Sequence, residues 1–244
     1  MAVKQKLILL LIAILLPANM WVGGKLLKRL YPPVPAEPKS PAYEARANML
    51  AELAKQLDAE VVFAGDSLTF FCPLNDFFPG KNVQNCGILS DTSTGLVKRW
   101  DATVTSFNPR HVFILIGIND ILSESDTDIA SELEPILQKT PPGSIYLQSI
   151  LPVAGKPAKL IPRIRSVNKE LARTAKENGQ FFLDIHSALA GPDGKLKAEY
   201  TYDGIHLTYS GYQAWKSAIL KELNTLRRPQ STVPESGGAA ESPL

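Results

Sequence analysis

The chain has 244 residues, of which 45% are hydrophobic and 20% are charged. This composition is typical of an ordinary globular domain with short accessory segments, and it excludes a collagen-like or largely disordered protein. The two cysteines, Cys72 and Cys86, are too few for a disulfide scaffold or for a zinc site built of cysteines alone.

The charge is unevenly distributed along the chain. A net charge of +2 would by itself fit an anionic partner such as nucleic acid. Residues 1–30, however, hold five basic and no acidic side chains, whereas the remainder of the chain holds 21 basic and 24 acidic ones. The excess of positive charge therefore belongs to the N-terminal segment, and we expect no nucleic-acid partner.

The N-terminal segment, residues 1–30, is predicted to direct the protein to a membrane. Residues 7–24 carry no charge, and as a helix they would be roughly 27 Å long, near the roughly 30 Å thickness of the bilayer core. Lys4 and Lys6 precede this stretch, as basic residues precede the apolar core of a signal sequence. We expect an uncleaved signal anchor, with a cleaved signal peptide or a buried core helix as alternatives. The folded part of the chain would then lie outside the cytoplasm, membrane-anchored or secreted.

Two further segments flank the predicted domain. Residues 31–42 contain five prolines, which predicts a semi-extended linker. Residues 228–244 are rich in Pro, Ser and Gly and have no apolar period, which predicts a disordered tail. The folded domain is therefore expected over residues 43–227.

Within this domain, short apolar runs alternate with helical patterns. Taken together, the runs are mainly apolar rather than alternating, as is typical of strands buried on both faces. They lie at residues 61–64, 82–86, 111–116, 144–150 and 181–185. Apolar residues recur at helical spacing over residues 42–57, 94–106, 128–139, 161–178 and 210–226. Gly179, directly after the fourth of these ranges, is a typical helix stop. The alternation predicts a three-layer α/β/α sandwich around a five-stranded parallel sheet.

Polar residues next to glycine follow three of the predicted strands, at 65–68, 85–87 and 117–120. In parallel sheets, ligands bind beyond the carboxyl ends of the strands. Asp203 and His206, three residues apart, precede the last helix, and an Asp at this spacing can orient an imidazole and stabilise its cation. The chain thus offers a serine (Ser67), an acid and a base in that order.

At these residues the chain resembles the GDSL/SGNH hydrolase superfamily. Its four blocks match here as Gly-Asp-Ser-Leu at 65–68, Gly87, Gly-x-Asn-Asp at 117–120 and Asp-x-x-His at 203–206. The amino-acid sequence around the second and third blocks is most similar to that of bacterial sialate O-acetylesterase-like and platelet-activating-factor acetylhydrolase-like members. The Gly-Asp-Ser-Leu tetrapeptide alone would be weak evidence for this resemblance, whereas four spaced blocks at predicted strand ends are specific evidence.

The resemblance implies a flavodoxin-like SGNH fold and a serine esterase that needs neither cofactor nor metal. It implies Ser67 as nucleophile, His206 as general base and Asp203 as its orienting partner. The oxyanion hole would consist of the backbone N–H groups of Ser67 and Gly87 and the side-chain amide of Asn119. The chemistry is reasonable on its own terms, because a serine hydroxyl needs an adjacent base and a developing oxyanion needs preorganised donors.

The substrate class stays open among several alternatives. We expect short-chain acyl esters or O-acetyl esters of carbohydrates. Lysophospholipase or thioesterase activity is the nearest alternative, because a membrane tether would bring the site close to lipid. Transfer of the acyl group to a sugar of the cell envelope is another, and an anchored binding module without turnover is a third. The oligomeric state does not follow from the sequence.

Each site residue also has a purely structural interpretation. Ser67 could be a helix N-cap, Asn119 and Gly87 could belong to turns, and Asp203 with His206 could form a surface turn. Asp184 and His186 end the fifth strand and could hold a metal, although a structural role is expected because a third ligand is missing. Cys72 and Cys86 are expected as buried free thiols, with a disulfide as the alternative.

Overall fold

The computed structural model describes residues 39–227, with side chains up to residue 222. The domain is built on a five-stranded parallel sheet with the strand order β2-β1-β3-β4-β5. The strands are β1 (Val61–Gly65), β2 (Val83–Gly87), β3 (His111–Leu115), β4 (Ile145–Gln148) and β5 (Phe181–Leu183). All five lie where the apolar runs predict them, and the expected parallel sheet is confirmed.

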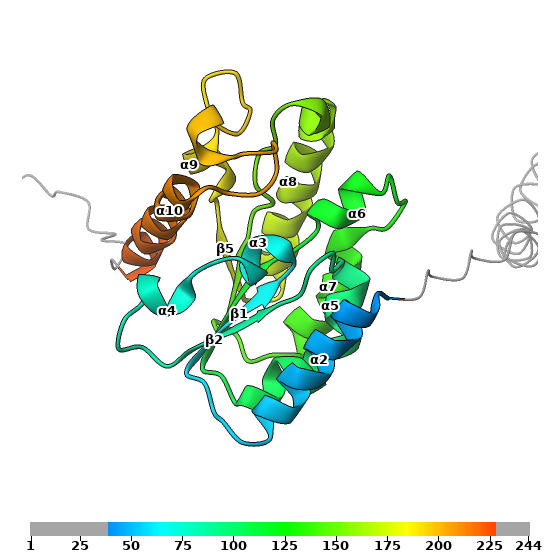
Figure 1. The fold of residues 1–244 in the computed structure, drawn as a ribbon, viewed down its shortest axis with the longest axis vertical. Coiled ribbons are helices and arrows are strands. Elements are labelled where there is room, and N and C mark those ends of the chain that lie inside the picture. The colour runs from blue at the N-terminus through cyan, green and yellow to red at the C-terminus, as the bar shows by residue number, and fades with distance from the viewer. Residues whose placement is uncertain (1–38, 228–244) are drawn as a thin grey trace, which may run out of the picture. The chain divides into compact units, whose positions relative to one another are not determined.

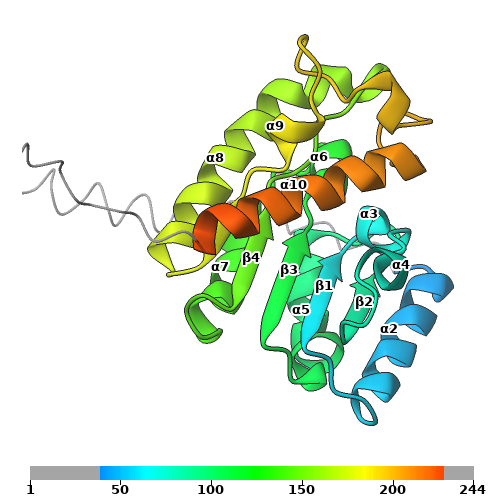
Figure 2. The same cartoon turned by 90° about the vertical axis from the view of Figure 1, so that its left-hand side faces the viewer.

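Helices cover both faces of the sheet, as Figures 1 and 2 show. On one face, neighbouring helices pack against one another in the order α2 (Pro41–Ala54), α5 (Ser93–Thr103), α7 (Ile129–Lys139) and α8 (Ile161–Glu177). On the other face runs α10 (Tyr209–Arg227), in orange in Figure 2. The three-layer sandwich is therefore confirmed, and these five helices are the ones that the sequence predicts.

Short helical segments that the sequence did not predict fill the connections between these elements. They are α3 (Ser67–Phe70), α4 (Leu74–Phe77), α6 (Ile118–Leu122), α9 (His186–Leu189) and the 3-10 turns η1 (Thr105–Phe107), η2 (Lys156–Leu160) and η3 (Ala198–Tyr200). Each has three to five residues, which is too short to show a helical period in the sequence. Two of them, α3 and α6, begin directly after strands of the sheet and carry candidate site residues.

The ends of α8 show how local sequence sets the boundaries. The helix ends at Glu177, with Asn178 as its C-cap, and Gly179 follows with φ +67°. This left-handed conformation costs glycine little because it has no Cβ. The helix stop predicted at Gly179 is therefore confirmed.

A row of aromatic rings lies across four adjacent strands of the sheet. The strands bring Phe63 opposite Phe113, Phe113 opposite Tyr146 and Tyr146 opposite Phe181. Successive rings stack with centroids 4.6 to 5.0 Å apart, and Trp215 of α10 packs on Phe63 at 5.6 Å. Stacked cross-strand pairs of this kind fix the register of the strands, and with it the positions of the strand ends that carry the site.

The N-terminal hydrophobic helix expected within residues 1–30 lies outside the described residues, as do most of the linker and the tail at 228–244. From residue 39 to residue 227, no helix has both the length and the apolar character that crossing a bilayer requires.

A buried polar cluster lies at the carboxyl edge of the sheet, under the ends of β1, β2 and β3. Asp66, Asp91 and Asp120 are each at most 2% exposed. Asp91 pairs with Arg99, which is also buried, at 2.8 Å, and Asp120 accepts from the N–H and the hydroxyl of Ser93. Asp66 has a single side-chain bond, from the Leu68 N–H to Oδ1, and its Oδ2 has no partner among the described residues.

Burial raises the pKa of Asp66 to about 7, and the neighbouring carboxylates Asp91 and Asp120 add to the effect, against the lowering by the Leu68 N–H. The unfolded chain ionises near pH 4, so between about pH 4 and 7 the unfolded state releases a proton that the folded state keeps. The free energy of unfolding should therefore fall over this interval, by at most about 4 kcal/mol from this group, and level off above pH 7.

The variant Asp66→Asn tests this account, because the amide cannot ionise but still offers Oδ1 to the Leu68 N–H. We expect its free energy of unfolding in urea to decline less between pH 4 and 8 than that of the wild type. The exposed Asp76→Asn serves as the control and should follow the wild type. Parallel pH profiles for Asp66→Asn and the wild type would show that Asp66 is not the group responsible.

Candidate active site

Ser67 lies at the carboxyl end of β1, as the first residue of α3. Asp66, not Ser67, is the N-cap of this helix, because its Oδ1 accepts the Leu68 N–H at 2.9 Å. The interpretation of Ser67 as an N-cap is therefore wrong, and its hydroxyl is free for another bond. The residue before Asp66 must be a glycine for the end of β1 to pack closely against β3. A Cβ at Gly65 would lie 2.1 Å from the Leu115 carbonyl oxygen of β3.

His206 and Asp203 lie in a tight turn between η3 and α10. Asp203 Oδ1 accepts the backbone N–H groups of Ile205 at 2.9 Å and His206 at 2.8 Å, which fixes the carboxylate within the turn. Gly204 has φ +91°, and a Cβ there would lie 2.4 Å from the Ala154 carbonyl oxygen. The turn is thus held against the loop that follows β4.

The three predicted triad residues are joined by hydrogen bonds, although Ser67 and His206 are 139 residues apart. Ser67 Oγ lies 2.9 Å from His206 Nε2, and His206 Nδ1 lies 2.6 Å from Asp203 Oδ2. An ionised carboxylate only accepts, so Nδ1 carries the proton and Nε2 is left to accept from the Ser67 hydroxyl. This arrangement can remove a proton from Ser67 as the hydroxyl attacks a substrate.

The carboxylate of Asp203 stays ionised in this setting. Partial burial raises its pKa, but the hydrogen bonds from the His206 ring and from the N–H groups of Ile205 and His206 outweigh that effect, so its pKa lies below the ordinary value. A negative charge beside Nδ1 stabilises the imidazolium that forms when His206 takes a proton. The electrostatics therefore suit a general base at Nε2.

The three expected oxyanion donors lie at the ends of three neighbouring strands, with Gly65 paired to Gly87 on one side and Leu115 on the other. The Ser67 N–H belongs to the first residue of α3 and has no intrahelical acceptor. Asn119 in α6 donates one amide hydrogen to the Asp91 carbonyl at 2.8 Å, which leaves the second amide hydrogen for a ligand.

The third expected donor, Gly87, differs from the prediction in one respect. Its N–H donates to Oδ1 of Asn85 at 2.9 Å, while Nδ2 of Asn85 donates to the Thr69 carbonyl at 2.8 Å. A ligand oxygen must therefore share this N–H with Asn85 or replace it. The glycine itself is needed for close packing on α3, because a Cβ would lie 2.3 Å from the Phe70 nitrogen.

Three residues near the site were not found from the sequence. Arg46 of α2 donates to the Asn85 carbonyl at 2.8 Å and, at 3.4 Å, to the Gly87 carbonyl. The rings of Phe71 and Tyr202 flank His206, each with its centroid 6.0 Å from that of the imidazole. The two aromatic residues lie next to the motifs in the sequence, and this position could have indicated them. No local pattern connects Arg46 with a strand end about forty residues away.

The remaining candidates lie outside the triad. Cys72 and Cys86 are buried and free, as expected, and burial raises the pKa of both thiols, so neither forms a thiolate that competes with Ser67. Asp184 accepts from the N–H and the hydroxyl of Ser187 at the start of α9. His186 has Nδ1 3.0 Å from the Ile150 carbonyl.

Comparison with known proteins gives a consistent result. Residues 63–214, more than half of the chain, match the GDSL-like Lipase/Acylhydrolase family. Platelet-activating factor acetylhydrolase IB subunit alpha2 of Rattus norvegicus is 25% identical over 182 residues, which are 70% of this chain and 77% of that protein. A GDSL-like lipase of Bacteroides thetaiotaomicron superposes with a TM-score of 0.63 at 26% identity, over 75% of this chain and 98% of that one.

An acetylxylan esterase of Geobacillus stearothermophilus, with a TM-score of 0.58 at 24% identity over 69% of this chain and 96% of that one, shares the fold. The family match includes the serine, the asparagine and the histidine whose geometry is described above. The chain therefore belongs to the GDSL-like lipase/acylhydrolase family, and it is a carboxylic ester hydrolase.

Proposed function

We propose that the protein hydrolyses short acyl esters, in particular O-acetyl esters of carbohydrates, through Ser67, His206 and Asp203. The observation that carries the proposal is the chain of two hydrogen bonds from Ser67 Oγ to His206 Nε2 at 2.9 Å and from His206 Nδ1 to Asp203 Oδ2 at 2.6 Å. Together they supply a nucleophile, a base in the required tautomer and a charged partner for that base.

In the proposed reaction, Ser67 Oγ attacks the ester carbonyl carbon while His206 Nε2 takes its proton. The negative oxygen of the tetrahedral intermediate accepts from the Ser67 N–H, the free amide hydrogen of Asn119 and the N–H of Gly87. The C–O bond to the alcohol then breaks, and His206 returns the proton to the leaving alkoxide. Water, deprotonated by His206, attacks the acyl-enzyme in the same way, and the acid leaves as Ser67 regains its proton.

The surroundings of the triad support a small acyl group on a large alcohol. The side chains of His206 and Asp203 are 27% and 40% exposed, so a bulky alcohol can approach from solvent. Phe71 is 51% exposed and Tyr202 68%, and both lie beside His206, where a sugar ring can stack on an aromatic face. The acetylhydrolase activity named for the mammalian relative agrees with a short acyl group.

We also propose that the domain acts outside the cytoplasm, attached through residues 1–30 or released after their cleavage. This proposal rests on the uncharged stretch at 7–24 and the lysines before it, which lie outside the described residues. The mass of the protein recovered from membrane and soluble cell fractions distinguishes the two forms. A full-length protein confined to the cytosol would contradict both.

Replacing the nucleophile should abolish hydrolysis without affecting the fold. For Ser67→Ala we expect kcat for p-nitrophenyl acetate to fall by at least about 10³-fold, because the remaining donors stabilise the oxyanion but nothing forms the acyl-enzyme. The exposed Ser217→Ala on α10 is the matched control and should retain full activity. Equal rates for Ser67→Ala and the wild type would refute the mechanism.

The rate should decline as the acyl chain lengthens. We expect kcat/KM for p-nitrophenyl esters to be highest for acetate and lower for longer chains, and acetylated sugars to be hydrolysed faster than lysophospholipids or acyl thioesters. A maximum at long chains would instead favour a lysophospholipase or thioesterase. Analysis of products in the presence of a polysaccharide acceptor distinguishes transfer to water from transfer to a sugar hydroxyl.

A further inference from the structure

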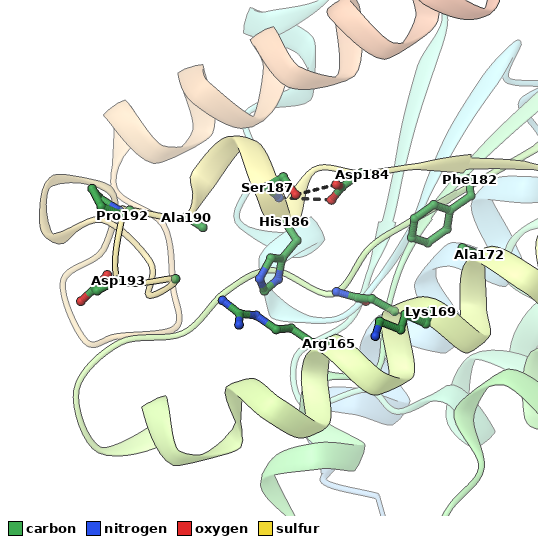
Figure 3. A pocket seen from close by; sticks show the side chains of 13 residues that line it. Arg165, Lys169, Ala172, Phe182, Asp184, His186, Ser187, Ala190, Pro192 and Asp193 are labelled. Carbon is green, nitrogen blue, oxygen red and sulfur yellow. Dashed lines mark hydrogen bonds between the residues drawn. The ribbon is translucent and has the colours of Figure 1, made fainter.

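A second concave site lies on the β5 side of the domain, between α8 and the segment that follows β5. We call it the α8–β5 groove. It has a volume of about 810 Å³, within the roughly 300–1,000 Å³ range of small-molecule sites. Figure 3 shows Arg165 and Lys169 extending from α8 on one side, with Phe182, His186 and the hairpin that carries Asp193 on the other. None of these residues belongs to the triad or the expected oxyanion hole.

The lining of the groove holds two cationic side chains, Arg165 and Lys169, and two acidic ones, Asp184 and Asp193. Arg165 and Lys169 are one helical turn apart, so their side chains share a face of α8, and neither forms an ion pair with any residue from 39 to 222. The two acidic residues of the lining are engaged elsewhere. Asp184 accepts from Ser187, and Asp193 pairs with Lys195 at 3.0 Å. Lys195 neutralises Asp193, so the groove keeps two cations without an ion pair among the described residues against the single charge of Asp184, an excess that favours an anionic ligand.

His186 adds a hydrogen-bond acceptor to the same groove. It is 8% exposed, and Figure 3 shows its ring turned toward the Arg165 side chain. Its Nδ1 faces the Ile150 carbonyl, which only accepts, so Nδ1 carries the hydrogen and the neutral ring keeps a lone pair on Nε2. This buried Nε2 has no hydrogen-bond partner among the described residues. An unpaired buried acceptor is costly, and a ligand hydroxyl would satisfy it.

The groove and the triad lie along the same edge of the sheet. Three strand spacings separate β1, which ends just before Ser67, from β5, or roughly 14 Å at about 4.8 Å per strand. One loop, which follows β4, touches both sites: the Ile150 carbonyl faces His186, and the Ala154 N–H donates to the Gly204 carbonyl in the Asp203–His206 turn at 2.8 Å. A single extended ligand could therefore contact both.

We infer that the α8–β5 groove binds a carboxylate-bearing sugar unit of the substrate, with the carboxylate on Arg165 and Lys169 and a hydroxyl donating to His186 Nε2. The half-buried ring of Phe182 offers a face for the sugar ring to pack on. A carboxylate alone would satisfy the cations but not the acceptor, and a neutral sugar would satisfy only the acceptor. That the α8–β5 groove forms part of the substrate site rests on the proposed function. That it binds an acidic sugar does not.

The test is calorimetric titration of the full-length protein with an unacetylated glucuronate trisaccharide and with its carboxyl-reduced counterpart. These probes differ only in having a carboxylate or a neutral hydroxymethyl group at the same carbon and need no turnover, so the result is independent of whether Ser67 acts as a nucleophile. We expect the acidic probe to bind at least tenfold more tightly, and its binding to weaken as NaCl is raised, because exposed charge pairs are screened. Equal binding of the two probes, or no binding of either, would overturn the inference.

Three variants locate the binding. Arg165→Gln combined with Lys169→Gln should reduce the affinity for the acidic probe at least tenfold, whereas Lys176→Gln, on the same helix outside the groove, should not. His186→Asn keeps a donor near the position of Nδ1 and removes Nε2, so it should lower the affinity for both probes. Thermal unfolding of each variant checks the fold. Unchanged affinity in the folded double variant would place the binding elsewhere and refute the assignment.

The proposed function is tested separately by p-nitrophenyl acetate hydrolysis in the wild type. If the enzyme hydrolyses the ester but does not bind the acidic probe, the proposed esterase function stands and binding in the α8–β5 groove is refuted. Binding without hydrolysis would support the groove and exclude the esterase mechanism.

Discussion

A buried ion pair between Arg99 of α5 and Asp91 of the β2–α5 loop connects the elements on which the site is built. Arg99 Nε lies 2.8 Å from Asp91 Oδ2, and Arg99 Nη2 donates to the carbonyl of Gly65 at the end of β1. Removing two charges from water is costly, and it is compensated only where further hydrogen bonds satisfy both groups. Here Tyr43 of α2 donates to the other oxygen of Asp91, at 2.9 Å. The pair therefore joins two helices, a loop and a strand end.

The same loop residue also contacts a candidate oxyanion donor. The Asp91 carbonyl accepts the Asn119 amide at 2.8 Å, which holds this candidate donor relative to the strand end before Ser67. Asp120, next to Asn119, holds the start of α5 through Ser93. Loss of one partner of such a pair leaves a buried charge uncompensated and costs about 3–5 kcal/mol. Because an oxyanion donor acts only when it is held in place, we expect the loss of this network to lower activity as well as stability.

The sheet and the triad could be predicted from the sequence because both leave strong local signals. Strands β1, β3, β4 and β5 are largely apolar, as is typical of buried strands, and the Gly-Asp-Ser-Leu and Asp-x-x-His blocks carry their residue types at fixed spacing. Arg46 and Arg99 leave no such signal, because their partners are distant in the chain. The bond from the Gly87 N–H to Asn85 depends on one side-chain conformation. The α8–β5 groove arises only when α8 and β5 are side by side, and Arg165 and Lys169 alone look like an ordinary solvated helix face.

The proposed mechanism requires Ser67 to form a covalent acyl-enzyme during hydrolysis. The most direct measurement is peptide mass analysis of the wild-type protein quenched in acid shortly after mixing with p-nitrophenyl acetate. The account predicts one acetyl group on the peptide that contains Ser67, lost on further incubation without substrate. Turnover with no acetylated peptide, or with the acetyl group on another residue, would contradict it.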